Sequence, residues 1–386
     1  MYNFIKKNKI LFSFFLFIFL YNFIQIYEYA YDKYAFQYGD WLINYSNGFL
    51  RRGLIGEIFL IISKLTNLNL QIIFFLSLVL LILIFYTKNF LIFTKIKLNY
   101  LILSLLFSPF LFLFTILNHS SGIRKEYLLL VVFIFLITEL IKKFNEKQLW
   151  KYIFIFQLLL LSHELSFFFL PYFILIFIYS SNKKNIKLIK KQIIILCFTS
   201  LFTFFLLYLF KGDSSYIAPL CKSFGSAAYN NCLQSGVVHM SFNQSVKSVF
   251  FTLLSWMDVK GFLSFLLIAI IYFSPFILFL NKKIKFETFN FEKFKINKKF
   301  TFILLFFVST ISYPLFLISF DWGRWLSILF FLNFYFIIFL ILKKIMIFNE
   351  QLWFTKSINF NNFKKNISLI VIFLIYSTFA TPGVCL

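Results

Sequence analysis

Long apolar runs recur along the whole chain and are separated by short lysine-rich segments. Several runs approach the ~20 residues that a helix needs to cross about 30 Å of hydrocarbon. Only 13% of the 386 residues are charged, whereas a soluble domain carries about 25%. The runs are continuous, unlike the alternating strands of a membrane β-barrel. The sequence therefore predicts an all-α fold, a polytopic transmembrane helical bundle.

The lysines give this bundle an expected orientation, because short cytoplasmic loops collect positive charge. Lys6, Lys7 and Lys9 precede the first run, which places the N-terminus inside and favours a retained helix over a cleaved signal peptide. We expect about eleven helices in a single membrane domain over residues 1–386, with the C-terminus outside. Outer loops are expected at 27–70 and 211–247, and lysine-rich inner loops at 87–98, 181–191, 281–299 and 343–366. The net charge of +24 then reflects inner loops that face anionic lipid, and no nucleic-acid partner is expected.

The predicted membrane helices follow the apolar runs. They cover 10–26, 71–86, 100–117, 127–141, 149–180, 193–210, 261–280, 300–320, 326–342 and 367–381, with short surface helices at 54–65 and 249–257. The run 149–180 is too long for one span, since it would measure roughly 48 Å at ~1.5 Å per residue. A hairpin that turns at His163-Glu164 fits better. Its arms are shorter than the hydrocarbon is thick, which places both residues below the outer surface.

Arginine is rare in this chain and falls on one side of the predicted membrane. The four arginines are Arg51, Arg52, Arg124 and Arg324, and all lie in the outer segments together with every aspartate and histidine. A planar guanidinium binds phosphate oxygens in pairs, which lysine does less well. The alternative is that the arginines anchor the helices at lipid headgroups. Because lysine serves that purpose elsewhere, we expect an external anion-binding site.

Two stretches carry this expected site. In the segment 47–57, Gly48, Gly53 and Gly56 flank Arg51-Arg52 and allow a close approach of backbone to a ligand. Arg124-Lys125 opens a helix, where two cations oppose the helix dipole and a bound pyrophosphate would offset that cost. The alternative there is a solvated loop end. We therefore predict that the four arginines and Lys125 bind pyrophosphate.

Catalytic candidates lie near the same stretches. His163-Glu164 interrupts an apolar run, and ionisable groups at membrane depth usually face a cavity. Either is a candidate general base, although the pair could also simply lock the hairpin. Asp40 and Asp321 are rival bases. Their neighbours Trp41, Trp322 and Trp325 are candidates to stack on sugars, or belong to the aromatic belt of a membrane protein.

The cysteines suggest an oxidising compartment and no metal site. Cys221 and Cys232 share an outer loop and could form a disulfide. No Cys/His spacing fits zinc, and neither a phosphate-binding glycine loop nor a dinucleotide fingerprint occurs. We expect no metal and no cofactor.

In architecture and in the placement of its outer arginines, the whole chain resembles the bacterial O-antigen and capsule repeat-unit polymerases. Those membrane enzymes are rich in Phe, Leu and Ile, have a large outer loop and depend on outer arginines. The chain is also similar to C-type polyprenyl-phosphate-sugar glycosyltransferases, in which a catalytic acid precedes a surface helix, as Asp40 precedes 54–65 here. Their paired acidic motif is absent.

These resemblances imply a function. We expect a metal-independent glycosyltransferase of the bacterial inner membrane that acts at the periplasmic face on polyprenyl-pyrophosphate-linked oligosaccharides in surface-polysaccharide (lipopolysaccharide) biosynthesis. Its partners would be the lipid-linked oligosaccharide, membrane lipids and other assembly proteins. One alternative is a C-type enzyme that uses a polyprenyl-phosphate monosaccharide. Another is a flippase for lipid-linked sugars, which is disfavoured because we detect no internal repeat.

Overall fold

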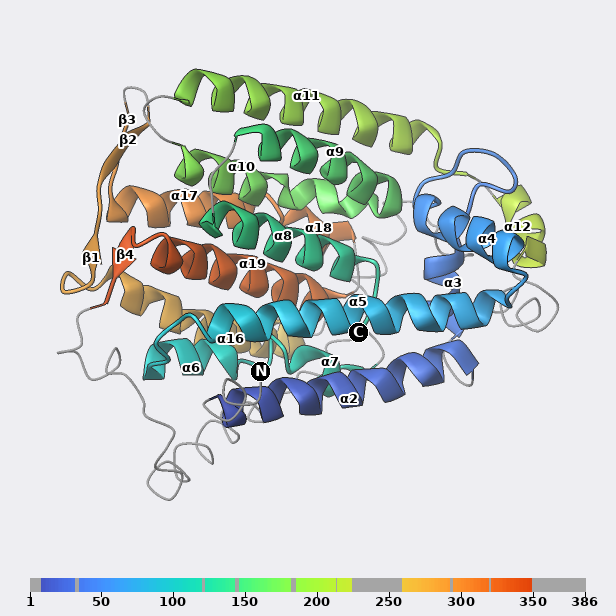
Figure 1. The fold of residues 1–386 in the computed structure, drawn as a ribbon, viewed down its shortest axis with the longest axis horizontal. Helices are drawn as coiled ribbons and strands as arrows, with labels where there is room; N and C mark the ends of the chain where they lie inside the picture. The colour runs from blue at the N-terminus through green and yellow to red at the C-terminus, as the bar shows by residue number, and fades with distance from the viewer. Residues whose placement is uncertain are drawn as a thin grey trace.

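The computed structural model describes residues 8–31, 35–119, 122–142, 146–181, 185–212, 214–223, 259–291, 294–318 and 321–348. This part of the chain is mostly helical (Figure 1). Five of its segments are long and apolar enough to cross a membrane: α2 (Lys9–Tyr31), α5 (Leu70–Phe93), α11 (Ile186–Leu209), Lys298–Leu317 and α19 (Trp322–Leu342). A mostly helical protein with several apolar membrane helices is therefore confirmed. The count of about eleven helices and their sidedness stay predictions.

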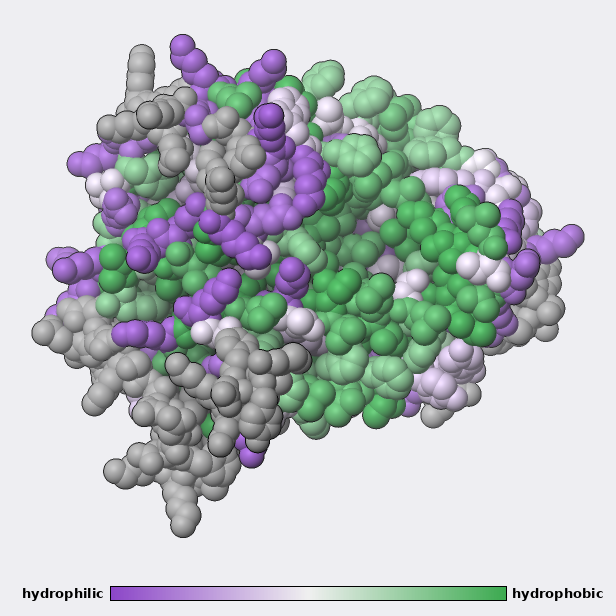
Figure 2. All heavy atoms as spheres, in the orientation of Figure 1, coloured by the Kyte–Doolittle hydropathy of each residue, from purple (hydrophilic) through white to green (hydrophobic). Residues whose placement is uncertain are grey.

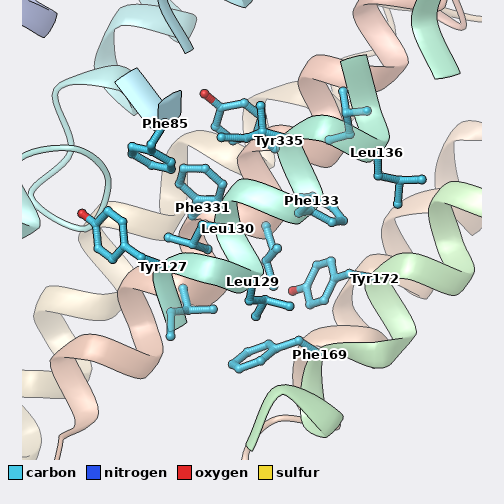
Figure 3. Close-up of a cluster of buried hydrophobic side chains, with 14 of the residues drawn as sticks. Phe85, Tyr127, Leu129, Leu130, Phe133, Leu136, Phe169, Tyr172, Phe331 and Tyr335 are labelled. Atoms are coloured by element: carbon cyan, nitrogen blue, oxygen red, sulfur yellow. The ribbon is translucent and has the colours of Figure 1, made fainter. Parts of the chain in front are cut away.

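Helix α19 forms the centre of the bundle. From Trp325 to Leu340 every residue is buried, as expected of a helix that is apolar on all faces. Helix α8 (Glu126–Lys142) packs against it. Figure 3 shows side chains of α8, such as Phe133, enclosed by Phe331, Tyr335 and Tyr172 from neighbouring helices. This apolar centre fixes the positions of the first residues of α8 and α19, where charged residues lie.

The predicted hairpin is present within 149–180. Helix α9 (Glu146–Ser162) ends at His163, whose backbone is extended, and the chain returns through the 3-10 helix η2 (Glu164–Phe169) and α10 (Leu170–Ser180). Pro171 fits the first turn of α10, where no backbone N–H is needed. Figure 1 shows the reversal. The turn places the side chains of His163 and Glu164 inside the protein, with exposures of 3% and 7%.

Three helices predicted as continuous are divided at prolines. The segment 100–117 consists of α6 (Tyr100–Leu106) and α7 (Phe114–Leu117), with Pro109 in the turns between them. The segment 261–280 is α16 (Val259–Phe273) followed by the 3-10 helix η4 (Ser274–Leu280), and 300–320 is α17 (Lys298–Thr310) followed by α18 (Pro314–Ile318). Proline removes a helical hydrogen bond and clashes with the preceding turn, so uninterrupted helices were the wrong prediction.

Short strands lie at one end of the mostly helical fold. Strand β1 (Lys285–Phe286) pairs antiparallel with β4 (Met346–Ile347), and β2 (Phe289–Phe291) pairs with β3 (Phe294–Ile296). The β1–β4 pair joins two of the lysine-rich loops predicted to share a side. We call this the lysine end (left in Figure 1). Figure 2 shows hydrophilic side chains gathered there and a hydrophobic band across the middle of the molecule.

At the opposite end lie short helices that cover the starts of α8 and α19. They are α3 (Ala35–Leu42), α4 (Leu54–Thr66), the 3-10 helix η3 (Ser214–Tyr216) and α12 (Ile217–Ser223). Helix α4 corresponds to the surface helix predicted at 54–65, and its outward face is apolar, with Ile58, Ile61 and Leu65 exposed. We call this the arginine end. The helices predicted at 249–257 and 367–381 lie outside the described residues.

Candidate functional site

Ten charged or titratable residues from five separate segments converge at the arginine end. We call them the charged cluster: Asp40 from α3, Arg51 and Arg52 from the loop before α4, Arg124, Lys125 and Glu126 from the start of α8, His163 and Glu164 from the hairpin turn, and Asp321 and Arg324 from the start of α19. All the predicted pyrophosphate-binding and catalytic residues are among them. The structure adds Glu126.

The first half of the cluster is built on a double contact between Arg52 and Glu164. Arg52 Nε donates to Glu164 Oε1 and Oε2 at 3.0 and 2.8 Å, and Arg52 Nη2 donates to Oε1 at 2.7 Å. Arg51 Nη1 lies 3.8 Å from the same Oε1, and Asp40 Oδ1 lies 3.9 Å from Arg52 Nη1. Paired charge-assisted hydrogen bonds of this kind are strong. Glu164 is therefore engaged by arginine and is a poor proton acceptor.

Glycines let the double-arginine segment fold tightly against its neighbours. A Cβ on Gly53 would lie 2.1 Å from Tyr45 Cε1, and one on Gly56 would lie 2.1 Å from the carbonyl oxygen of Ile43. Gly48 has a φ of +109°, a turn conformation that favours glycine, and a Cβ there would meet nothing within 4 Å. The expected close approach of backbone to a ligand at these glycines stays a prediction. Gly53 and Gly56 are needed for packing.

The second half of the cluster is centred on Glu126. His163 Nε2 and Arg324 Nη1 lie 3.3 and 3.2 Å from Glu126 Oε1. Asp321 Oδ2 lies 3.3 Å from Arg324 Nη2 and 3.7 Å from Arg124 Nη2. An acidic residue in the first turn of a helix is common because of the helix dipole, which is why sequence reasoning missed Glu126. Its position directly after two cations was the available signal.

Glu126 also borders a small cavity. Neither of its carboxylate oxygens accepts a hydrogen bond from the described residues, although the side chain is buried. The cavity has a volume of about 20 Å³ and is lined by Arg124, Glu126 and Arg324 above an apolar floor that includes Phe85 and Phe331. A space of this size holds about one water-sized group. The cavity places polar atoms of three charged side chains around a single small volume.

The environments of the arginines differ. Burial opposes the charge of Arg52, but Glu164 outweighs it and raises the pKa above its ordinary value. Burial lowers the pKa of Arg51; Glu164 only partly offsets this, and Arg52 lowers it further. Burial and then the charge of Arg324 lower the pKa of Arg124. Arg51 and Arg124 are thus the guanidiniums that an added anion would stabilise most.

His163 is arranged to take up a proton. Burial lowers the pKa of its imidazole, although the charge of Glu126 opposes this shift. Its Nε2 faces Glu126, while Nδ1 has no hydrogen-bond partner among the described residues. Nε2 lies 3.3 Å from Glu126 Oε1 without a hydrogen bond, and a tautomer with its proton on Nε2 would leave Nδ1 as the acceptor. A neutral imidazole beside a carboxylate is a candidate general base.

The three tryptophans do not face a sugar-sized space. Trp41 is 1% exposed, stacks on Phe59 and donates to the carbonyl oxygen of Ile123. Trp325 is fully buried, and Trp322 is 7% exposed and donates to a backbone carbonyl in α18. All three rings pack inside the protein, and their role in sugar stacking stays a prediction. The indole N–H groups of Trp41 and Trp322 find carbonyl partners, as buried indoles usually do, whereas Trp325 Nε1 has none among the described residues.

Two further predictions concern cysteine and metal. Cys221 is disulfide-bonded and buried in α12, while its predicted partner Cys232 lies outside the described residues. Within the described part of the chain, no three His, Cys, Asp or Glu side chains form a group suited to a metal ion.

Comparison with known proteins gives no assignment. No protein-family model, curated protein or solved structure matches the chain. A proposed function therefore depends on the geometry of the charged cluster.

Proposed function

We propose that the protein is a membrane glycosyltransferase that transfers sugar from a polyprenyl-pyrophosphate-linked oligosaccharide, as a repeat-unit polymerase of bacterial surface polysaccharide does. The observation that carries this proposal is the charged cluster itself. Five cations and four carboxylates from distant segments are gathered beneath a cover of short helices at one end of an apolar bundle. Burying so many charges is costly, and a function that needs them accounts for the cost.

The cations supply the binding chemistry. Arg51 is the most exposed arginine of the cluster, with 25% of its side chain accessible, and Arg124 is 12% accessible. In the proposal these two hold the donor pyrophosphate and stabilise the charge that develops as it leaves. Arg52 and Arg324 hold Glu164, Glu126 and Asp321 in place.

His163 supplies the base. The acceptor hydroxyl oxygen bonds to the anomeric carbon of the donor sugar, and the bond from that carbon to the pyrophosphate oxygen breaks with its electron pair. The hydroxyl proton passes to His163 Nδ1, and Glu126 stabilises the resulting imidazolium. Because His163 is 3% exposed, substrate binding has to open a path to it. Asp40 and Glu164, both within reach of Arg52, then hold the arginines.

We place this site at the periplasmic face of the bacterial inner membrane, opposite the lysine end, following the rule that cytoplasmic loops are positive. The two alternatives remain a C-type glycosyltransferase that uses a polyprenyl-phosphate monosaccharide and a flippase. A flippase needs charges along a path between both faces, whereas the charged cluster lies at one end of the described bundle. This favours the enzyme.

The test is product formation by purified protein in nanodiscs. With a polyprenyl-pyrophosphate oligosaccharide as substrate, the wild type should release pyrophosphate-linked lipid and form longer saccharides. Arg51→Met and His163→Gln should form none, and Lys95→Ala at the lysine end should match the wild type. If the wild type forms no longer product, or if Arg51→Met matches it, the proposal is wrong.

A further inference from the structure

The backbone of Arg52 has an uncommon conformation. Its φ is +64°, in the left-handed region that residues with side chains seldom occupy. Contacts fix the segment on both sides: Arg51 N donates to the carbonyl oxygen of Phe210 at 3.1 Å, and Gly53 N donates to that of Leu50 at 3.3 Å. This conformation directs the Arg52 side chain into Glu164 and leaves Arg51 beside it. Strained backbone of this kind persists only where its surroundings determine it strongly.

Lys125 makes one of those determining contacts. Its Nζ donates to the carbonyl oxygen of Arg52 at 2.7 Å. The contact links the start of α8 to the loop before α4, across 73 residues of sequence. Lys125 is 1% exposed and is among the largest fully buried side chains. A ligand that reaches Arg51, the most accessible of the four arginines, therefore has no comparable access to Lys125.

Burial also makes Lys125 less basic. It lowers the pKa of the ammonium to about 8, although the nearby carboxylate of Asp40 favours the charged form. Such a lysine is mostly charged at neutral pH and loses its charge at mildly alkaline pH, whereas its N–H groups remain donors in either state. Lys125 can therefore donate the hydrogen bond to the Arg52 carbonyl oxygen whether or not the side chain is charged.

We propose that Lys125 is a positioning residue that holds the Arg51-Arg52 turn in its left-handed conformation, and that it does not itself contact the bound anion. The sequence placed Lys125 among the pyrophosphate-binding residues; the geometry instead points to an action through Arg51. The inference rests on the proposed function, because it takes a pyrophosphate group as the ligand.

A double-mutant cycle tests this role, with inorganic pyrophosphate as the probe and calorimetry in nanodiscs as the measurement. Lys125→Met and Arg51→Met should each weaken binding about tenfold. The double variant should bind within about twofold of Arg51→Met alone, since Lys125 acts through Arg51. In the Arg124→Met background, Lys125→Met should still cost about tenfold. Independent, multiplying effects of Lys125→Met and Arg51→Met would overturn the inference.

A charge-preserving variant serves where Lys125→Met is poorly folded. Lys125→Arg keeps the cation but is longer, so it should shift the turn and weaken pyrophosphate binding about tenfold. Binding equal to that of the wild type would mean that the charge at position 125 is what the anion senses, which contradicts the inference.

Hydrogen–deuterium exchange separates this inference from the proposed function. Without any ligand, Lys125→Met should speed amide exchange in residues 47–57 and leave α11 unchanged. If the wild type binds no pyrophosphate, the proposed function fails while this exchange result still decides the positioning role. Unchanged exchange in 47–57 would refute that role even if pyrophosphate binds.

Discussion

The two ends of the bundle both carry positive charge, but they hold it in different ways. At the lysine end the side chains of Lys95, Lys190 and Lys283 are exposed, and the nearby Lys151–Glu139 pair leaves half of the lysine side chain accessible. At the arginine end Lys125 is buried, the four arginines are partly buried, and each cation contacts carboxylates or backbone. Exposed charge costs little and requires no particular geometry. Buried charge has to be compensated by specific partners. The specific arrangement of charges at the arginine end therefore indicates a functional site.

The largest difference should be in stability. Glu164→Ala leaves Arg52 buried without its main partner, and breaking a buried pair costs about 3–5 kcal/mol. Glu139→Ala removes the partner of exposed Lys151 and should cost at most about 1 kcal/mol. Thermal unfolding in a fixed detergent compares the two. Equal losses would mean that the Arg52–Glu164 contact is not a buried structural pair.

The second difference should be in activity. Arg51→Lys and Arg124→Lys keep the charge but lose the planar two-point donor, and each should lower the rate of saccharide elongation about 100-fold. The reverse exchange at the other end, Lys95→Arg, should leave the rate unchanged. Initial rates at saturating donor provide the measurement. Wild-type rates in both lysine variants would show that any cation suffices.

Packing of the double-arginine segment should give a smaller effect. In Gly53→Ala the new methyl group would meet the ring of Tyr45, and relief of such overpacking costs about 1–3 kcal/mol. Gly48→Ala meets nothing within 4 Å but has a φ of +109°, so about 1 kcal/mol is expected. Unfolding midpoints should therefore fall further for Gly53→Ala. A larger fall for Gly48→Ala would mean that the turn at Gly48 constrains this segment more than the packing of Gly53 does.

The smallest expected effect is a pH shift. His163 has to be neutral to accept a proton, and burial lowers its pKa below the ordinary value of about 6.5. The elongation rate should therefore persist at pH 6.5 and fall only at more acidic pH. Stability should change in the same direction, because the unfolded chain binds the proton more readily and native stability is lost as pH falls below about 6.5. His163→Gln should remove this stability loss; its retention would assign the titration to another group.

Several features of this fold were predictable because they depend on local physics. The length of 149–180 required a turn, and the charged pair His163-Glu164 marked its place. The uneven distribution of arginine indicated that Arg51, Arg52, Arg124 and Arg324 share one end. The prolines that divide the helices were visible, but the apolar runs were given more weight than Pro109 and Pro314.

Other features depend on which segments meet, and no local pattern states that. The central role of Glu126 follows from its contacts with residues 37 and 198 positions away, His163 and Arg324. The burial of Trp41 depends on α4 and on the loop that leads to α8. The engagement of Glu164 by Arg52, which transfers the role of base to His163, likewise comes from a contact across 112 residues.

The most direct test of the account is the binding of inorganic pyrophosphate at the two ends, followed by calorimetry in nanodiscs. The account predicts saturable binding by the wild type, loss of binding in the double variant Arg51→Met/Arg124→Met, and unchanged binding in the matched double variant Lys95→Met/Lys283→Met. Binding that survives in the arginine variant, or that is lost equally in the lysine variant, would contradict the claim that the arginine end is the anion site.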